Sequence, residues 1–136
     1  ITKVQHSEWG SPLVVVPKPN RDVRLCIDFK LTLNPQLMDA RYPIPRIEEI
    51  FNKMKGGRYF CTLDIHKAYL HLQVDDNSKR LQTFSSHKGT YQMNRLAFGV
   101  KTPPNEFQKF MDDAIGGLEG TASYFDDIII QGSIVE

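Results

Sequence analysis

Short runs of continuous or alternating apolar residues occupy the first part of the chain. Residues 13–16 are a continuous apolar run, and apolar and polar side chains alternate over residues 23–27. Residues 17–22, between these runs, contain proline, asparagine and aspartate, which favour turns. The pattern therefore predicts a β-hairpin over residues 13–27, with Arg24 on the face opposite to the apolar set of the second strand.

Four further segments have strand patterns. Residues 58–65 carry apolar or aromatic side chains on both faces, which predicts a central strand of a sheet. Residues 81–86 and 91–96 flank a short polar segment and predict a second hairpin. Residues 123–130 place an aspartate pair between β-branched and aromatic residues. Because aspartate favours turns and its neighbours favour strands, this stretch predicts a third hairpin with the pair at its tip.

Two segments repeat apolar residues with the period of a helix. The first is predicted to begin near Pro45, which suits the first helical position, and to end at the glycine pair 56–57. Its apolar stripe consists of Ile47, Ile50, Phe51 and Met54. The second is opened by the proline pair 103–104, with Thr102 as its candidate N-cap. Its stripe consists of Phe107, Phe110, Met111, Ala114 and Ile115. Strands and helices together predict an α+β fold.

Composition places the chain among ordinary globular proteins. Its 136 residues are 40% hydrophobic and 24% charged, with a formal net charge of +1, which fits one domain with a real core. The longest aliphatic runs are too short to span a bilayer, so no membrane association is expected. Cys26 and Cys61 form neither a CxxC pair nor a disulfide framework, which fits a reducing, intracellular compartment.

Three aspartate pairs occur, and their neighbours distinguish them. Residues 75–76 lie in a polar run and residues 112–113 in a helical pattern, so these pairs are predicted to be a solvated turn and a solvated helix face. Only Asp126 and Asp127 lie between strand formers. Two adjacent, partly buried carboxylates are costly unless a cation neutralises them, and hard oxygen ligands suit Mg²⁺.

Asp64 lies near the end of the predicted strand 58–65. It is either the N-cap of a short helical turn that follows, or a third carboxylate that joins Asp126 and Asp127. Three carboxylates can hold two divalent ions about 3.5 to 4 Å apart, a pair suited to phosphoryl or nucleotidyl transfer. Lys18 and Arg24 on the first hairpin are either solubilising charges or phosphate ligands.

Other common catalytic patterns are missing from the sequence. No glycine-rich phosphate loop and no Gly-x-Ser-x-Gly nucleophile motif occurs. The four histidines lack the spacing of metal ligands. The aspartates are therefore the main candidates for chemistry.

Four segments, in the same order along the chain, match motifs of one family. They are Arg24-Leu25-Cys26-Ile27-Asp28-Phe29 with Asn34-Pro35 and Tyr42-Pro43-Ile44-Pro45; Leu63-Asp64-Ile65 with Ala68-Tyr69; Phe98-Gly99-Val100 with Pro104, Phe107 and Gln108; and Tyr124-Phe125-Asp126-Asp127. In these segments, from about His6 onward, the chain resembles the reverse transcriptases of gypsy-like LTR retrotransposons. Lys30 stands where arginine is common in the family, and Lys101 where a small or uncharged residue is usual.

The resemblance implies a fold and a domain composition. The expected architecture is a right-hand polymerase palm, an antiparallel sheet with helices packed on one face, plus partial fingers. Residues 1–136 are expected to be a fingers and palm fragment without thumb, connection or RNase H domain. Because the thumb grips the duplex, the resemblance implies negligible processive synthesis by the fragment alone.

Site residues carry over from the same resemblance. It implies that Asp64, Asp126 and Asp127 are catalytic and bind two Mg²⁺, or Mn²⁺ in their place, with the backbone carbonyl of Ile65. The primer 3′-hydroxyl then attacks the α-phosphorus of a dNTP and releases pyrophosphate.

Nucleotide and template contacts are implied for the fingers and adjoining segments. Lys18 and Arg24 are expected to hold the triphosphate, and the ring of Tyr69 to exclude a ribose 2′-hydroxyl. Phe98 is expected to line the sugar pocket. The residues expected against the template are Lys30, Gly99 and Pro104.

The expected partners are an RNA or DNA template with its primer, dNTP, and the remainder of a Pol polyprotein. A cytoplasmic particle and the nucleus are both open as the intracellular location. Two alternatives to a polymerase stay open. One is a retroelement remnant without catalysis that acts as a nucleic-acid or protein interaction module. The other is a two-metal nuclease or nucleotide cyclase on a similar palm scaffold, which explains the aspartates but neither Tyr69 nor the first hairpin.

Overall fold

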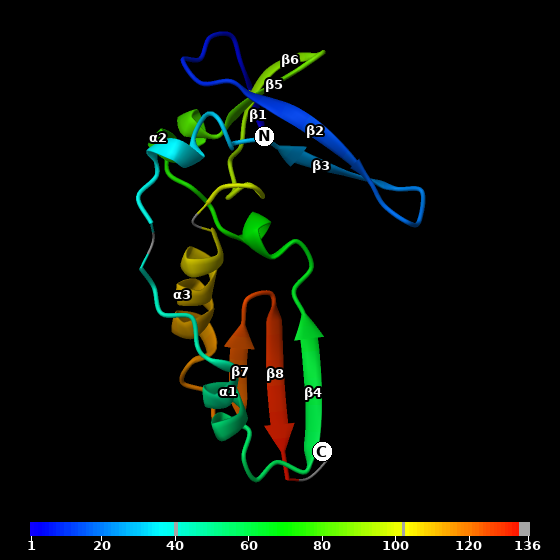
Figure 1. Cartoon of the computed structure of the whole chain (residues 1–136), viewed down its shortest axis with the longest axis vertical. Coiled ribbons are helices and arrows are strands. Elements are labelled where there is room, and N and C mark those ends of the chain that lie inside the picture. The colour runs from blue at the N-terminus through cyan, green and yellow to red at the C-terminus, as the bar shows by residue number, and fades with distance from the viewer. Residues whose placement is uncertain (40, 102, 134–136) are drawn as a thin grey trace. The chain divides into compact units, whose positions relative to one another are not determined.

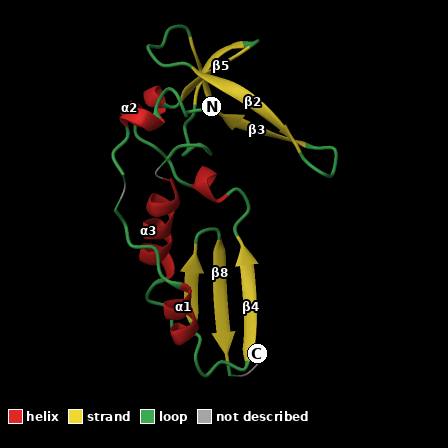
Figure 2. Cartoon of the chain, in the orientation of Figure 1, coloured by secondary structure: helices red, strands yellow, loops and turns green. Residues whose placement is uncertain are grey.

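The computed structural model describes residues 1–39, 41–101 and 103–133. The N-cap predicted for Thr102 lies outside these residues. Two compact units make up the chain: unit 1 is Ile1–Asp39 with Tyr69–Pro103, and unit 2 is Ala40–Ala68 with Pro104–Glu136. Strands and helices occur in both units (Figures 1 and 2), so the predicted α+β class is confirmed.

Unit 1 is built on a five-stranded sheet with the order β1-β6-β5-β2-β3. Its elements are β1 (Thr2–Val4), β2 (Ser11–Pro17), β3 (Val23–Ile27), the 3₁₀ helix η1 (Asn34–Gln36), α2 (Asp76–Leu81), β5 (Thr83–Ser86) and β6 (Gly89–Gln92). A second 3₁₀ helix, η2 (Ala68–His71), spans the boundary between the units in the sequence. The hairpin predicted over residues 13–27 is confirmed, because β2 and β3 pair antiparallel from Leu13 opposite Ile27 to Pro17 opposite Val23.

The second predicted hairpin is present but shorter than expected. Strand β5 begins at Thr83, since Leu81 ends helix α2, and β6 ends at Gln92. The polar run at residues 75–78 is therefore no turn. Asp75 caps α2, accepting a 2.7 Å hydrogen bond from the backbone N–H of Ser78, and this is the bond an N-cap residue supplies.

The core of unit 1 lies where the sheet meets the segment after β3. Its buried residues are Ile27, Phe29, Leu33, Phe84 and Ala97. Phe29 is only 1% exposed, and burying a ring to this degree contributes roughly 1.5–3 kcal/mol to folding. This core fixes the end of β3 and the loop that follows residue 97.

Unit 2 contains a three-stranded antiparallel sheet with the order β4-β8-β7, and β8 lies in the middle (Figure 1). Its elements are α1 (Ile47–Lys53), β4 (Tyr59–Asp64), α3 (Pro103–Ile115), β7 (Thr121–Tyr124) and β8 (Asp127–Gly132). The prediction that residues 58–65 form a central strand is wrong. Strand β4 is an edge strand with every residue exposed, and the isoleucine run of β8 takes the central position.

Helix α1 covers part of this sheet. Ile50 and Met54 form a buried cluster with Ala122 of β7, and Tyr124 and Ile129 pack against it. The predicted apolar stripe is only half correct, because Ile47 and Phe51 are 55% and 69% exposed. Pro45 also lies outside the helix, since Arg46 occupies the N-cap position.

The described part of the chain contains no helix with both the length and the apolar character needed to cross a membrane.

Candidate active site

The aspartate pair lies at the turn between β7 and β8. Tyr124 pairs with Asp127, so the turn consists of Phe125 and Asp126, and Asp127 already begins β8. The sequence predicted both aspartates at the tip of the hairpin, but in the structure only Asp126 lies in the turn and Asp127 belongs to the strand. Phe125 has φ 51°, a left-handed conformation that is rare for a residue with a bulky side chain. In a two-residue turn, a positive φ at the first central position is the type II′ pattern, where glycine is usual.

Asp64 is brought to the same end of the sheet. Strands β4 and β8 pair with Asp64 opposite Asp127. The N–H of Ile65 donates a 2.8 Å hydrogen bond to the carbonyl of Asp126. Helix η2 starts only at Ala68, so Asp64 does not occupy an N-cap position. Asp64 thus lies beside the pair Asp126 and Asp127, although it is far from them in the sequence.

The environment of Asp126 is unfavourable for its charge. Burial raises the pKa of this carboxyl above its usual range, and the neighbouring charges of Asp127 and Asp64 raise it further. Its Oδ1 atom is buried and, among the described residues, is the buried side-chain atom without a hydrogen-bond partner. A buried carboxylate oxygen without a hydrogen-bond partner is rare, so this oxygen is a candidate ligand for a cation.

The donor set fits a hard divalent cation, although its side chains are not arranged around one. Among the described residues, no group of three or more His, Cys, Asp or Glu side chains has a geometry that could hold a metal ion. Asp127 and Asp64 are close enough to raise the pKa of Asp126. Like charges turn apart when nothing neutralises them, and carboxylate oxygens are the ligands Mg²⁺ prefers.

A buried glutamine of α3 contacts the backbone of the turn. The side chain of Gln108 is fully buried, and its Oε1 accepts a 3.0 Å hydrogen bond from the N–H of Phe125. Its Nε2 donates to the carbonyl of Ser123 at 3.2 Å, to Ser123 Oγ at 2.9 Å and to Asp112 Oδ1 at 3.0 Å. In the sequence, Gln108 stood out only through the family motif, since a glutamine in a helix has no signal of its own.

Asp112 departs from the sequence prediction. It was placed on a solvated helix face, but its carboxylate accepts hydrogen bonds from Gln108, from Ser123 Oγ at 3.1 Å and from Tyr42 Oη at 2.7 Å. This bond to Asp112 is also the main reason why the pKa of Tyr42 is raised. The contact joins residues 70 positions apart, which no local pattern reveals.

The two cations on the β2–β3 hairpin belong to unit 1. Lys18 Nζ lies 3.4 Å from Asp22 Oδ2, and both side chains are substantially exposed. Arg24 pairs with Val16 across the hairpin and is exposed. Alternation places Arg24 on the face opposite Val23 and Leu25, as predicted.

Two predicted nucleotide contacts meet each other in unit 1. The rings of Tyr69 in η2 and Phe98 have their centroids 5.2 Å apart at 49°, within the range of an aromatic pair. Both side chains are half-buried. The resemblance assigned both residues, 29 positions apart, to the sugar of the nucleotide, and the structure shows that their rings are in contact.

The predicted template contacts lie in different places. Lys30 is exposed, directly after the buried Phe29. Gly99 has φ 96°, and a Cβ there would lie 2.7 Å from the carbonyl oxygen of Ile27, so only glycine fits. Its loop is held by Asn34, which donates to Gly99 O and accepts from the N–H of Lys101. Pro104 lies in the first turn of α3, in unit 2.

Comparison with known proteins gives one consistent family. Residues 16–134 match the model of the family described as reverse transcriptase (RNA-dependent DNA polymerase). The retrovirus-related Pol polyprotein from transposon 412 of Drosophila melanogaster is 37% identical over 134 residues, which cover 93% of this chain and 11% of the relative. The corresponding polyprotein from transposon gypsy of the same organism is 32% identical over 138 residues, covering 96% and 13%. The chain thus spans only 11% to 13% of the length of these relatives.

Solved structures agree with this family at the level of the fold. The foamy viral protease-reverse transcriptase in complex with an RNA/DNA hybrid has a TM-score of 0.83 and 21% identity, covering 96% of this chain and 18% of that one. The predicted right-hand polymerase fold is therefore confirmed.

Proposed function

Because the chain belongs to the reverse transcriptase family, we propose that it is the fingers and palm part of an RNA-directed DNA polymerase. It would transfer a nucleotide from a dNTP to a primer 3′-hydroxyl, within a longer Pol polyprotein that supplies the thumb and RNase H domain. The observation that carries the proposal is the strand register that sets Asp64 opposite Asp127, beside the turn that bears Asp126. We expect slow, distributive synthesis at most without the thumb.

The carboxylates of Asp64, Asp126 and Asp127, with the carbonyl of Ile65, would hold two Mg²⁺ ions, or Mn²⁺ in their place. The unpartnered Oδ1 of Asp126 and the raised pKa of this carboxyl support the assignment. A bound cation would give Oδ1 a partner and would stabilise the charged form of the carboxyl. When bound, such ions lower the pKa of an attacking hydroxyl and neutralise charge on a leaving phosphate.

The proposed reaction exchanges one bond at the α-phosphorus for another. The primer 3′-hydroxyl gives its proton to water and its oxygen bonds to the α-phosphorus, while the bond from the α-phosphorus to the bridging oxygen breaks and pyrophosphate leaves with that electron pair. The task of this chain is to hold three negative side chains at fixed positions on a rigid sheet. Strand pairing does this for Asp64 and Asp127, and the turn does it for Asp126.

The hairpin β2–β3 would contact the triphosphate. Lys18 and Arg24 are exposed enough to reach a ligand, and each can form charge-assisted hydrogen bonds to phosphate oxygens. Lys18 would exchange Asp22 for the triphosphate. This exchange is easy, because an exposed ion pair is worth only about 0–1 kcal/mol.

The Tyr69–Phe98 pair would select the sugar. Phe98 buttresses one side of the tyrosine ring, and a ring that cannot move aside excludes the 2′-hydroxyl of a ribonucleotide by contact. We therefore expect Phe98→Ala to relax the discrimination against ribonucleotides, because the ring of Tyr69 would gain room.

The nucleic-acid partner would be an RNA or DNA template with its primer. Lys30, Gly99 and Pro104 would lie along the template strand. The foamy viral relative was solved with an RNA/DNA hybrid, which supports this choice of partner.

The direct test measures dTTP incorporation on poly(rA)/oligo(dT) by a version of the protein extended through the thumb. We expect Mg²⁺-dependent incorporation that Asp126→Asn lowers by about 10³-fold, because the metal site loses a charged ligand. Asp113→Asn, on the exposed side of α3, is the control and should keep full activity. Equal activity of Asp126→Asn and the unaltered protein would refute the assignment. Hybrid binding without any incorporation would instead favour the interaction module.

A further inference from the structure

We infer that Asp112 is a positioning residue for the carboxylate turn: its carboxylate fixes the amide of Gln108, and that amide holds the backbone of the turn that bears Asp126. The inference rests on the proposed function, since the position of Asp126 matters only if its carboxylate acts. All residues involved lie in unit 2.

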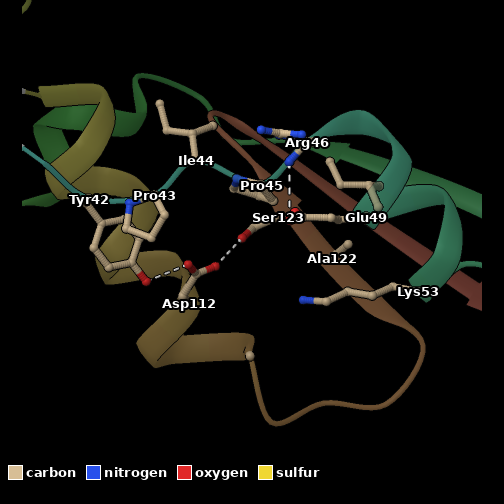
Figure 3. Close-up of a pocket in the computed structure, with 12 residues that line it drawn as sticks. Tyr42, Pro43, Ile44, Pro45, Arg46, Glu49, Lys53, Asp112, Ala122 and Ser123 are labelled. Carbon is tan, nitrogen blue, oxygen red and sulfur yellow. Dashed lines mark hydrogen bonds between the residues drawn. The ribbon is translucent and has the colours of Figure 1, made fainter.

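The first step is the set of bonds around Asp112. Figure 3 shows the chain of contacts that runs from the hydroxyl of Tyr42 through the Asp112 carboxylate to Ser123. Oδ2 accepts from Tyr42, and Oδ1 accepts from both Ser123 and Gln108. An ionised carboxylate only accepts hydrogen bonds, so each of these neighbours must present a hydrogen to it.

The second step concerns the orientation of the Gln108 amide. A glutamine amide has a donating end and an accepting end that are nearly equal in size, and its neighbours decide which way it points. Because Asp112 Oδ1 lies 3.0 Å from one end, that end must be the NH₂ group. The accepting Oε1 is then left facing the N–H of Phe125, at 3.0 Å.

The third step is the turn itself. Phe125 has φ 51°, a strained conformation for a non-glycine residue, so the turn needs contacts that hold it in this conformation. The N–H of Phe125 donates to Gln108 Oε1, and Gln108 Nε2 donates to the carbonyl of Ser123, so the amide holds the backbone on both sides of Tyr124. Asp126 follows directly, so its backbone position depends on both bonds.

Tyr42 connects this network to the segment before α1. Tyr42 and Asp112 line a cavity of about 550 Å³, with Arg46, Lys53 and Ser123 among the other lining residues (Figure 3). The Tyr42–Asp112 bond therefore fixes the side of the carboxylate that faces the cavity. Without the Tyr42 hydroxyl, Oδ2 loses its donor and the Asp112 carboxylate can rotate. Because Oδ1 can still accept from Gln108, the Gln108 amide is then less firmly oriented but not released.

The test compares Asp112→Leu with Asp113→Leu in the version extended through the thumb. Leucine has the branched shape of aspartate but accepts no hydrogen bond, and Asp113 is the exposed neighbour on the same helix. In metal-free buffer, we expect hydrogen exchange of the Phe125 amide to rise about tenfold in Asp112→Leu and to stay unchanged in Asp113→Leu. The Mg²⁺ concentration for half-maximal incorporation should rise by a similar factor.

Asp112→Asn separates positioning from charge. Its Oδ1 can still accept from Gln108 while its amide donates to Tyr42, so we expect exchange and Mg²⁺ requirement within about threefold of the unaltered protein. If the negative charge were what mattered, Asp112→Asn would resemble Asp112→Leu, and the inference would be wrong.

Tyr42→Phe covers the case in which Asp112→Leu does not fold, and it should raise Phe125 exchange about threefold. Unchanged exchange in every folded variant would overturn the inference whatever the activity shows. Loss of activity in Asp126→Asn with none in Asp112→Leu would keep the polymerase and reject the positioning role. If the unaltered protein incorporated no dTTP, the proposed polymerase function would be rejected. The exchange of the Phe125 amide would still decide whether Asp112 positions the turn.

Discussion

The two hairpin turns β2–β3 and β7–β8 each hold a non-glycine residue at positive φ, and they are stabilised in opposite ways. Arg21, in the β2–β3 turn, has φ 65°, and Phe125, in the β7–β8 turn, has φ 51°. The first turn is held by local, exposed contacts such as the 3.4 Å pair of Lys18 and Asp22. The second is held by the fully buried Gln108, from a different part of the chain.

The difference matches what each turn is proposed to do. A turn held by weak surface contacts can change partners, which suits groups that bind and release a triphosphate. A turn held by a buried amide cannot move without breaking several hydrogen bonds, which suits side chains that must keep a fixed spacing around cations. Four substitutions test this contrast, beginning with the largest expected effect.

Replacing Gln108 with leucine should have the largest effect. The substitution leaves the Phe125 N–H and the Ser123 carbonyl without the Gln108 amide as their partner, and it removes one donor to Asp112. These groups are buried or partly buried. We expect the free energy of unfolding to fall by about 3 kcal/mol. Urea unfolding measures the change, and Lys109→Leu, on the exposed neighbour, is the control. A loss below that of the control would mean that the second turn is no better held than the first.

Arg21→Gly should have a smaller effect of opposite sign. Glycine adopts a positive φ without strain, and the exposed turn loses no buried contact. We expect a gain of about 0.5 kcal/mol after the greater entropy of the unfolded glycine chain is subtracted. Thermal unfolding compares it with Arg21→Ala, which keeps the strain and should gain nothing. An equal gain in both variants would show that strain is not the cause.

Asp126→Asn should stabilise the metal-free protein in a pH-dependent way. The raised pKa means that the folded state holds this proton more tightly than the unfolded state does. The contribution of Asp126 to stability is therefore full below the ordinary carboxyl pKa of about 3.9 and is lost as the pH rises through the folded value. In EDTA, the thermal unfolding midpoint of Asp126→Asn should be higher than that of the unaltered protein at neutral pH. The difference between the two midpoints should vanish in acid. A difference that is the same at every pH would show that the charge of Asp126 is not the cause.

Lys18→Ala should have the smallest effect on stability. Its exposed pair with Asp22 predicts a change in unfolding free energy below about 0.5 kcal/mol. If Lys18 holds the triphosphate, the KM for dTTP should nevertheless rise, by about tenfold, with kcat less affected. An unchanged KM would remove Lys18 from the nucleotide site.

The sequence predicted what depends on near neighbours. Alternation indicated the first hairpin, because successive side chains of a strand point to opposite faces. Strand formers on both sides of Asp126 indicated the turn, because aspartate favours turns and its neighbours favour strands. Asp75 as an N-cap could also have been found, since Ser78 three residues later presents the N–H it bonds.

What the sequence could not predict depends on partners far along the chain. The apolar residues of β4 suggested a central strand, but position in a sheet depends on which strands pair, and β8 has neighbours on both sides. Asp112 looked solvated because its partner Tyr42 is 70 residues away. Likewise, β1 forms only by pairing with β6, far along the chain, and its three residues have no strand pattern of their own.

Binding of Mn²⁺, followed by electron paramagnetic resonance, tests the central claim most directly, because it asks whether carboxylates from β4 and from the β7–β8 turn hold the same ions. With the version extended through the thumb and dTTP present, we predict that Asp64→Asn and Asp126→Asn each weaken Mn²⁺ binding at least about tenfold. If Asp64→Asn bound Mn²⁺ as tightly as the unaltered protein while Asp126→Asn did not, the two strands would not share a metal site.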